Sequence, residues 1–179
     1  MNKFSVWLVP QKDDETYLSN IIEDLGTKYS APTFTPHLTL LGDTKVELDV
    51  LKNTVDKVFE STKPFEIKKT KLNQSEAFFK TVFIECELDK NLSNLFKVLS
   101  SSTVQRAIDT FKPHISLIYK IMPKEEKLKI IDSLDVKEVL TIGAVYITAP
   151  KDGANDFMDV KGWRVLYKKI LLKPLKFLL

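Results

Sequence analysis

Two short segments of this 179-residue chain are near copies of each other. Residues 34–40 (FTPHLTL) recur as residues 111–117 (FKPHISL). Each copy holds one histidine, followed two residues later by a hydroxyl residue, and these are the only two histidines in the sequence. The second copy follows the first by 77 residues (37 to 114), a period that is too long for a solenoid and occurs only twice. A chain of this kind is expected to fold as two related halves, each presenting one histidine.

The spacing of apolar residues predicts the same order of elements in both halves: strand, helix, histidine strand, helix, strand. In the first half the predicted strands are 3–9, 36–41 and 65–72, with one helix at 13–29 and another opened by the capping-box pattern of residues 44–47. In the second half the predicted strands are 79–88, 113–119, 140–149 and 163–172, with one helix capped by Asn91 and another beginning near Pro123, a bulge at Gly143 and a loop at 151–159. We therefore expect an α+β fold in a single bilobal domain, residues 1–179, with pseudo-symmetric halves of about 1–76 and 77–179.

Residues two apart in a strand project from the same face. His37 and Thr39 are therefore expected to point together, as are His114 and Ser116, while the apolar residues between them anchor both strands in the core. If the halves face each other, two imidazole–hydroxyl pairs converge on one cleft. With ordinary pKa values near 6.5, one imidazole can accept a proton from water while the other donates one to a leaving oxygen. The pattern favours acid–base hydrolysis of a phosphodiester, with the hydroxyls donating hydrogen bonds to phosphate oxygens.

Other chemistry fits these residues less well. Two histidines without a fixed carboxylate or cysteine partner make a poor metal site by ligand count, so no metal and no cofactor are expected. Ser116 lies two residues from His114 on one strand, and the sequence has no G-x-S-x-G elbow, which disfavours a serine nucleophile. Cys86 is the only cysteine and lies in an apolar run, so we interpret it as a buried structural thiol.

Composition sets the class of protein. Hydrophobic residues make up 44% of the sequence and charged residues 28%, as in ordinary soluble domains. The net charge of +3 comes with lysines spread along the chain, which is compatible with an anionic ligand and does not indicate a long nucleic-acid track. No stretch approaches the roughly 20 apolar residues of a membrane span, and residues 1–9 lack the apolar core of a secretory signal. We expect a cytoplasmic monomer without a membrane partner, whose basic, apolar end at 169–179 is a last strand plus a tail that folds back on the body.

The two histidine segments resemble the 2H phosphoesterase superfamily, which is named for two H-x-[ST]-x motifs. Within it, the chain is most similar to the cyclic phosphodiesterases of plants and yeasts, which act in tRNA-splicing metabolism. The likeness covers most of the chain in order and spacing, and includes the opening strand 5–7, the aromatic segment 78–83 and the second motif with its tyrosine, residues 114–119. This resemblance implies two lobes, each an antiparallel sheet with helices on its outer face.

The resemblance also implies roles for individual residues. His37 and His114 would be the catalytic pair, and the resemblance slightly favours His114 as the base and His37 as the acid. Thr39 and Ser116 would hold the phosphate. The substrate-lining residues would be Trp7, Phe79 and Tyr119. The implied reaction is hydrolysis of a small cyclic phosphate, either ADP-ribose 1″,2″-cyclic phosphate to the 1″-phosphate or nucleoside 2′,3′-cyclic phosphates to 2′-phosphates, without a metal.

Two other functions stay open. An enzyme that processes RNA 2′,3′-cyclic ends, or a relative of the 2′-5′ RNA ligases, would have RNA ends as its partner. Those relatives tend to carry an arginine shortly after the second motif, where this chain has Tyr119 and Lys120, and its only arginines are Arg106 and Arg164. A module that binds cyclic nucleotides or RNA ends without catalysis is disfavoured by the intact histidines and hydroxyls in both motifs. Lys80 and Lys120 are candidate contacts to a second phosphate.

Overall fold

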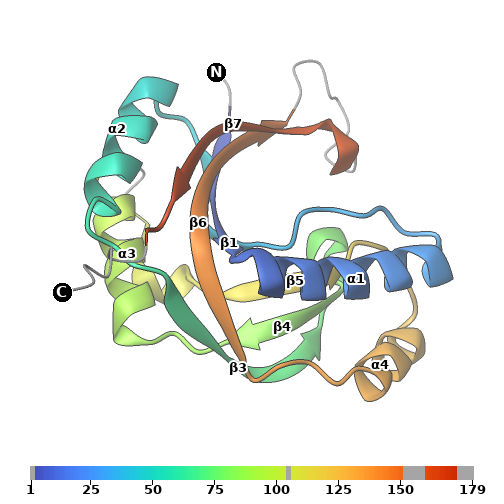
Figure 1. The fold of residues 1–179 in the computed structure, drawn as a ribbon. Helices are drawn as coiled ribbons and strands as arrows, with labels where there is room; N and C mark the ends of the chain where they lie inside the picture. Colours follow the sequence, from blue (N-terminus) through green and yellow to red (C-terminus); the bar gives the residue numbers. More distant parts are fainter. Residues whose placement is uncertain (1–2, 104–105, 151–159, 173–179) are drawn as a thin grey trace.

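The computed structural model describes residues 3–103, 106–150 and 160–172 (Figure 1). Its strands are β1 (Phe4–Pro10), β2 (Leu38–Thr44), β3 (Phe65–Gln74), β4 (Val82–Cys86), β5 (His114–Ile118), β6 (Val139–Pro150) and β7 (Trp163–Ile170). Its helices are α1 (Lys12–Tyr29), α2 (Leu48–Val58), α3 (Lys90–Ser101) and α4 (Lys124–Ser133), with short 3₁₀ turns at η1 (Phe78–Lys80), η2 (Ile108–Thr110) and η3 (Val160–Gly162). The order of strands and helices predicted for both halves is confirmed. The predicted loop 151–159 and the tail beyond residue 172 lie outside the described residues.

One antiparallel sheet contains all of these strands, in the order β1-β2-β5-β4-β3-β6-β7. The sheet also closes on itself, because β6 pairs with β1. Ile142 pairs with Pro10 of β1 and with Phe65 of β3, so β1 and β3 lie on opposite edges of β6. The remainder of β6, from Ala144 onward, pairs with β7. Figure 1 shows β6 as the long strand that runs from β7 at one end to β3 at the other.

This closed sheet does not match the expected description of two lobes, which is not confirmed. The last strand of the first half, β3, pairs with β4 and β6 of the second half. Likewise β6 pairs with β1 of the first half. Strands from the two halves are therefore interleaved by hydrogen bonds that the repeat in the sequence does not reveal. The division of one domain at about residue 76 stays a prediction.

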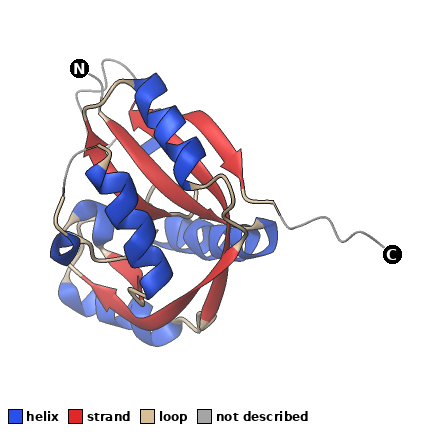
Figure 2. Cartoon of the chain, turned by 90° about the vertical axis from the view of Figure 1, so that its left-hand side faces the viewer, coloured by secondary structure: helices blue, strands red, loops and turns tan. Residues whose placement is uncertain are grey.

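Helices α2 and α3 cover the sheet through apolar faces. In α2 and the residue after it, Leu51, Val55 and Phe59 are at most 1% exposed. The apolar face of α3 is buried too, through Leu92, Leu95, Phe96 and Leu99. Figure 2 shows α2 and α3 side by side against the strands.

Several predicted helix starts and strand ends are wrong. Thr44 ends β2 and does not cap α2, because the residue at the N-cap is Glu47, which makes no side-chain capping bond. Asp89, and not Asn91, caps α3, with its carboxylate accepting the Leu92 N–H at 2.7 Å. The predicted strand 79–88 is shorter, since residues 78–80 form the turn η1.

The buried face of α4 includes a lysine. The side chains of Lys127 and Ile130 are at most 1% exposed, while Leu128 is 44% exposed. The bulge at Gly143 is confirmed: the β1–β6 register jumps from Val9↔Ala144 to Pro10↔Ile142, which leaves Gly143 unpaired. A Cβ at this position would lie 2.9 Å from the main chain that begins α1, so only glycine fits without a shift.

Candidate active site

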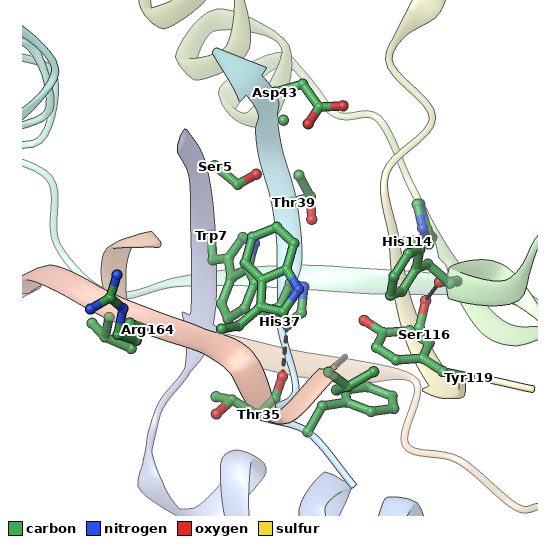
Figure 3. A pocket seen from close by; sticks show the side chains of 16 residues that line it. Ser5, Trp7, Thr35, His37, Thr39, Asp43, His114, Ser116, Tyr119 and Arg164 are labelled. Atoms are coloured by element: carbon green, nitrogen blue, oxygen red, sulfur yellow. Dashed lines mark hydrogen bonds between the residues drawn. The ribbon is translucent and has the colours of Figure 1, made fainter. Parts of the chain in front are cut away.

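A cavity of about 370 Å³ lies where the two histidine strands meet (Figure 3). All seven residues predicted for the site line it: Trp7, His37, Thr39, Phe79, His114, Ser116 and Tyr119. The other described residues that line it are Ser5, Phe34, Thr35, Gly42, Asp43, Val160, Trp163, Arg164 and Val165. Residues distant in sequence thus converge on one pocket, as the paired motifs predicted, although their roles are not established by this placement alone.

The alternation of β2 and β5 delivers the imidazoles and hydroxyls to the cavity. The two strands pair at Leu38↔Ile115, the residues directly after the histidines. The side chains between the polar ones point away from the cavity and are at most 1% exposed: Leu38, Leu40, Ile115 and Leu117. This burial anchors each strand, because fully burying one such side chain contributes about 1.5–3 kcal/mol.

Both imidazole rings are held in the same way by their own main chain. Nδ1 of His37 lies 2.7 Å from the Thr35 carbonyl oxygen, and Nδ1 of His114 lies 2.8 Å from the Lys112 carbonyl oxygen. A carbonyl oxygen can only accept, so Nδ1 carries the proton in each neutral ring. The Nε2 atom is then the one that exchanges protons with a ligand. The shared hydrogen bond follows from the shared motif, since each carbonyl is two residues before its histidine.

An aromatic ring from the neighbouring strand contacts each histidine. Trp7, paired in register with Thr39, stacks on His37 with ring centroids 3.7 Å apart and planes 10° apart. Phe83, paired in register with Ser116, meets His114 edge to face at 5.4 Å. Trp7 therefore fixes the plane of His37, a contact that the sequence did not predict for it. Phe83 occupies the corresponding place in the other half.

Burial controls the charge of both histidines. Burial lowers the pKa of His37 to about 4, opposed by the hydrogen bond to the Thr35 carbonyl and reinforced by the charge of His114. Burial also lowers the pKa of His114, opposed by the Lys112 carbonyl and reinforced by the positive charge of Lys80. Both lowered pKa values favour the neutral imidazoles at pH 7. An anion between the rings would favour their charged forms and raise both pKa values.

The two hydroxyls differ in their hydrogen bonds. Ser116 Oγ donates to the Phe79 carbonyl oxygen at 2.7 Å. Thr39 forms no hydrogen bond through its hydroxyl to any residue that the structure describes, so its proton is available to a ligand. The two hydroxyls were expected to play equal roles, but they differ in the protein itself, because that of Ser116 already donates a hydrogen bond.

Tyr119 and its neighbours form an aromatic wall of the cavity. Its ring stacks on Phe34 at 3.6 Å between centroids, and Phe79 meets it edge to face at 5.2 Å. Burial raises the pKa of the Tyr119 hydroxyl, an effect that hydrogen bonding with Ser116 opposes. The tyrosine is thus a neutral hydrogen-bonding group at physiological pH.

Nine described lining residues were not predicted from the sequence, and three of them come from β7. Trp163, Arg164 and Val165 follow His37 by more than 120 residues, and no local pattern links them to it. Ser5 could have been found, because it is two residues from Trp7 on β1 and shares its face. Phe34 is part of the repeated motif itself.

Other residues considered from the sequence lie outside the cavity. The ammonium group of Lys120 donates to the Tyr29 carbonyl at the end of α1, and that of Lys80 lies 4.4 Å from the centre of the Phe83 ring. Cys86 is buried, and burial raises the pKa of its thiol to about 12, so its structural interpretation is confirmed. Within the described ranges, no three His, Cys, Asp or Glu side chains are grouped to hold a metal ion. Nor is any described helix long and apolar enough to cross a membrane.

A model of one protein family matches residues 1–155 of the chain, and its description is "Cyclic phosphodiesterase-like protein". The chain belongs to this family. Two known relatives agree with this assignment. A cyclic phosphodiesterase of Arabidopsis thaliana is 22% identical over 124 residues, which are 69% of this chain and 68% of the relative. A 2′,3′-cyclic-nucleotide 3′-phosphodiesterase of Candida albicans is 28% identical over 114 residues, 53% of this chain and 46% of the relative. The expectation of an enzyme of the cyclic phosphodiesterase class is confirmed.

Solved structures share the fold at low sequence identity. Escherichia coli LigT complexed with phosphate superposes with a TM-score of 0.58 at 14% identity, covering 96% of this chain and 98% of LigT. The protein TT0787 of Thermus thermophilus gives a TM-score of 0.61 at 18% identity, covering 94% of this chain and 97% of its own. Together with the family, these likenesses confirm the resemblance to 2H phosphoesterases.

Proposed function

We propose that the chain hydrolyses small cyclic phosphates by an acid–base reaction between His37 and His114. The observation that carries this proposal is the matched pair of imidazoles, each holding its Nδ1 proton against a main-chain carbonyl and each lining one cavity. The candidate substrates are ADP-ribose 1″,2″-cyclic phosphate and nucleoside 2′,3′-cyclic phosphates. The name of the Candida relative supports the second class.

The chemistry requires one proton acceptor and one proton donor on opposite sides of phosphorus. Nε2 of the base removes a proton from water as the water oxygen bonds to phosphorus. The bond from phosphorus to one ring oxygen then breaks, and that oxygen takes the proton from Nε2 of the acid. One water is consumed and a phosphomonoester is formed, so the histidine pair ends with its protons exchanged. Each role typically contributes about 10²–10⁴ in rate.

We assign His114 as the base and His37 as the acid from the resemblance to the family, and one contact of each ring agrees with this assignment although burial lowers the pKa of His37. Lys80 places a positive charge near His114, which disfavours its charged form. Trp7 presents its π face to His37, and such a face stabilises a cation. Burial acts against the charged form of His37, so the anionic phosphate has to restore that form on binding.

Phosphorus NMR of the reaction products tests the proposed function. The pure protein is incubated with each cyclic phosphate in the presence of EDTA, and a phosphomonoester signal is expected. His37→Gln and His114→Gln should each lower kcat by about 10²-fold or more. Asp49→Asn, at an 88% exposed side chain of α2, is the matched surface control and should keep the wild-type rate. No turnover, turnover only with added metal, or one histidine variant near the wild-type rate would refute the mechanism.

The same assay separates the two functions that stay open. A short RNA with a 2′,3′-cyclic end is compared with the cyclic mononucleotide at equal concentration. A strong preference for the RNA would favour an end-processing enzyme. Thermal stabilisation by the cyclic nucleotide without any product would favour a binding module.

A further inference from the structure

Strand β1 contributes a hydroxyl to the cavity in addition to the ring of Trp7. Ser5 lies two residues before Trp7 on the same face of the strand, and both residues line the cavity. Ser5 is only 5% exposed, so its side chain is enclosed except where it meets the cavity. A Cβ added to Gly42 would lie 3.6 Å from Cγ2 of Thr39 and 4.0 Å from Oγ of Ser5. The two hydroxyl residues therefore border the same glycine, as Figure 3 shows.

The hydroxyl of Ser5 is unpaired within the described residues, since no hydrogen bond joins its Oγ to any of them. Thr148 faces Ser5 in the register of β1 and β6, and its hydroxyl donates to the Ser5 carbonyl oxygen at 3.4 Å instead. A buried hydroxyl without a partner destabilises a protein, and a hydrogen bond to a ligand offsets that cost. An enclosed, unpaired hydroxyl on a cavity wall therefore indicates a contact with a ligand.

Position relative to His37 separates Ser5 from another hydroxyl of the cavity, that of Thr35. The Thr35 carbonyl oxygen lies 2.7 Å from Nδ1 of His37, so Thr35 lies on the side of the ring opposite to its reacting Nε2. Figure 3 shows Thr35 on one side of His37, and Ser5 and Thr39 on the other. Ser5 and Thr39 are therefore the hydroxyls on the side where a phosphate would meet His37.

The hydroxyls near His114 are already engaged with each other and with the main chain. Ser116 Oγ donates to the Phe79 carbonyl oxygen at 2.7 Å, and it also takes part in hydrogen bonding with the Tyr119 hydroxyl. Binding a phosphate through Ser116 requires that the bond to Phe79 be broken first. Ser5 has no such bond to break within the described part of the chain.

The one acidic residue among the described lining residues does not close this end of the cavity to an anion. Asp43 has a side chain that is 60% exposed, and its carboxylate lies 3.9 Å from the ammonium group of Lys3. Solvent and this cation screen the negative charge, which weakens its repulsion of a bound phosphate.

A cyclic phosphodiester carries its negative charge on the two phosphorus oxygens that lie outside the ring. Hydrogen-bond donors aimed at these oxygens stabilise the charge as it shifts in the transition state. We propose that Ser5 is a further phosphate-binding residue, which donates a hydrogen bond to one of these oxygens next to the contact made by Thr39. This inference rests on the proposed function and adds a binding residue to it. Because Ser5 gives up no hydrogen bond within the described protein, it contributes more to binding than Ser116 does.

Ser5→Ala tests the proposal, with Thr44→Val as the matched control. Each change removes an unpaired hydroxyl from a buried residue, but Thr44 does not line the cavity. In Ser5→Ala, kcat/KM for a cyclic mononucleotide should fall about tenfold or more, a larger factor than in Ser116→Ala. The Kd for inorganic phosphate, measured by calorimetry, should rise by a similar factor. Thr44→Val should keep both values. The midpoint of urea unfolding should stay unchanged or rise in Ser5→Ala and Thr44→Val, because neither variant loses a hydrogen bond.

Three outcomes would overturn the inference. Ser5→Ala could keep the wild-type kcat/KM and phosphate affinity, or Thr44→Val could lose as much of both as Ser5→Ala does. A lower midpoint of urea unfolding in Ser5→Ala would show that the hydroxyl has a structural role in the free protein. Phosphate binding that depends on Ser5, without any turnover of a cyclic phosphate, would instead refute the proposed function and leave this inference standing.

Discussion

Removing the Thr39 hydroxyl should reduce activity more than removing the Ser116 hydroxyl, whereas removing the Ser116 hydroxyl should reduce stability more. The perturbations are Thr39→Val and Ser116→Ala, which delete one hydroxyl each with little change of shape. The Thr39 hydroxyl has no hydrogen-bond partner in the described part of the chain, while Ser116 Oγ donates to the Phe79 carbonyl at 2.7 Å. To bind phosphate through its proton, Ser116 must first give up this hydrogen bond.

The magnitudes follow from these two environments. A hydrogen bond to a charged acceptor contributes about 1.5–3 kcal/mol, so Thr39→Val should lower kcat/KM by about 10- to 150-fold. A neutral hydrogen bond such as that from Ser116 to Phe79 contributes about 1 kcal/mol, which reduces the net gain of Ser116 on substrate binding. The factor by which Ser116→Ala lowers kcat/KM should therefore be about five times smaller than the factor for Thr39→Val.

Stability should change in the reverse order. Ser116→Ala leaves the Phe79 carbonyl without this donor and should lower the free energy of unfolding by about 1–2 kcal/mol. Thr39→Val removes no hydrogen bond within the described protein, so the free energy of unfolding should change by less than about 0.5 kcal/mol.

Steady-state kinetics with a cyclic mononucleotide and urea unfolding of the same preparations measure both quantities. Ser116→Ala reducing activity as much as Thr39→Val, or Thr39→Val being the more destabilising change, would refute the reasoning. Either result would mean that the hydrogen bond to Phe79 does not distinguish the two hydroxyls.

Three other predictions concern protonation and packing. The pKa values of His37 and His114 are lowered in the free enzyme, so the pH optimum of kcat/KM should lie below about 6.5. The pH optimum of kcat should be higher, because kcat reports the complex with an anionic substrate. A kcat/KM optimum above pH 7 would contradict this prediction. Lys127→Met should lower the free energy of unfolding by about 1–3 kcal/mol, because the buried ammonium donates to the Ser75 carbonyl at 2.9 Å. Glu76→Gln, at the 82% exposed partner of Lys127, should lower it by less than about 1 kcal/mol. Urea unfolding of both variants measures this, and a larger loss for Glu76→Gln would contradict the prediction. Gly143→Ala should cost about 1–3 kcal/mol through its 2.9 Å contact with the main chain, so an unchanged melting temperature would argue against the close approach.

The stability of the fold should also depend on pH through His37, and the sign follows from burial. Its folded pKa of about 4 is below the unfolded value of 6.5, so the unfolded chain binds more protons between these values. Its contribution is complete above pH 6.5 and is lost as the pH falls towards 4. We expect this loss to be on the order of 1–3 kcal/mol and to shrink in His37→Gln; equal pH dependence of both proteins in urea unfolding would contradict the assignment.

Features that depend on local spacing were predictable from the sequence. The period of two places Leu38 and Ile115 in the core and turns the neighbouring imidazoles and hydroxyls to the opposite face, whatever the rest of the chain does. The cap of α3 was predicted wrongly because several neighbouring polar residues can cap a helix. Asp89, and not Asn91, accepts the hydrogen bond from the Leu92 N–H. Lys127 was unpredictable as a buried residue, since its burial depends on a main-chain carbonyl 52 residues away.

The sequence by itself determined that two histidines, each with its hydroxyl, would stand on strands of similar construction, because alternation and burial act within a few residues. Only the tertiary structure decided that the halves interleave their strands into one closed sheet, and that Trp163 and Arg164 of β7 complete the cavity. Those placements depend on hydrogen bonds between strands that are remote along the chain. No local preference encodes such pairings; they arise when the apolar faces of all the elements are buried together.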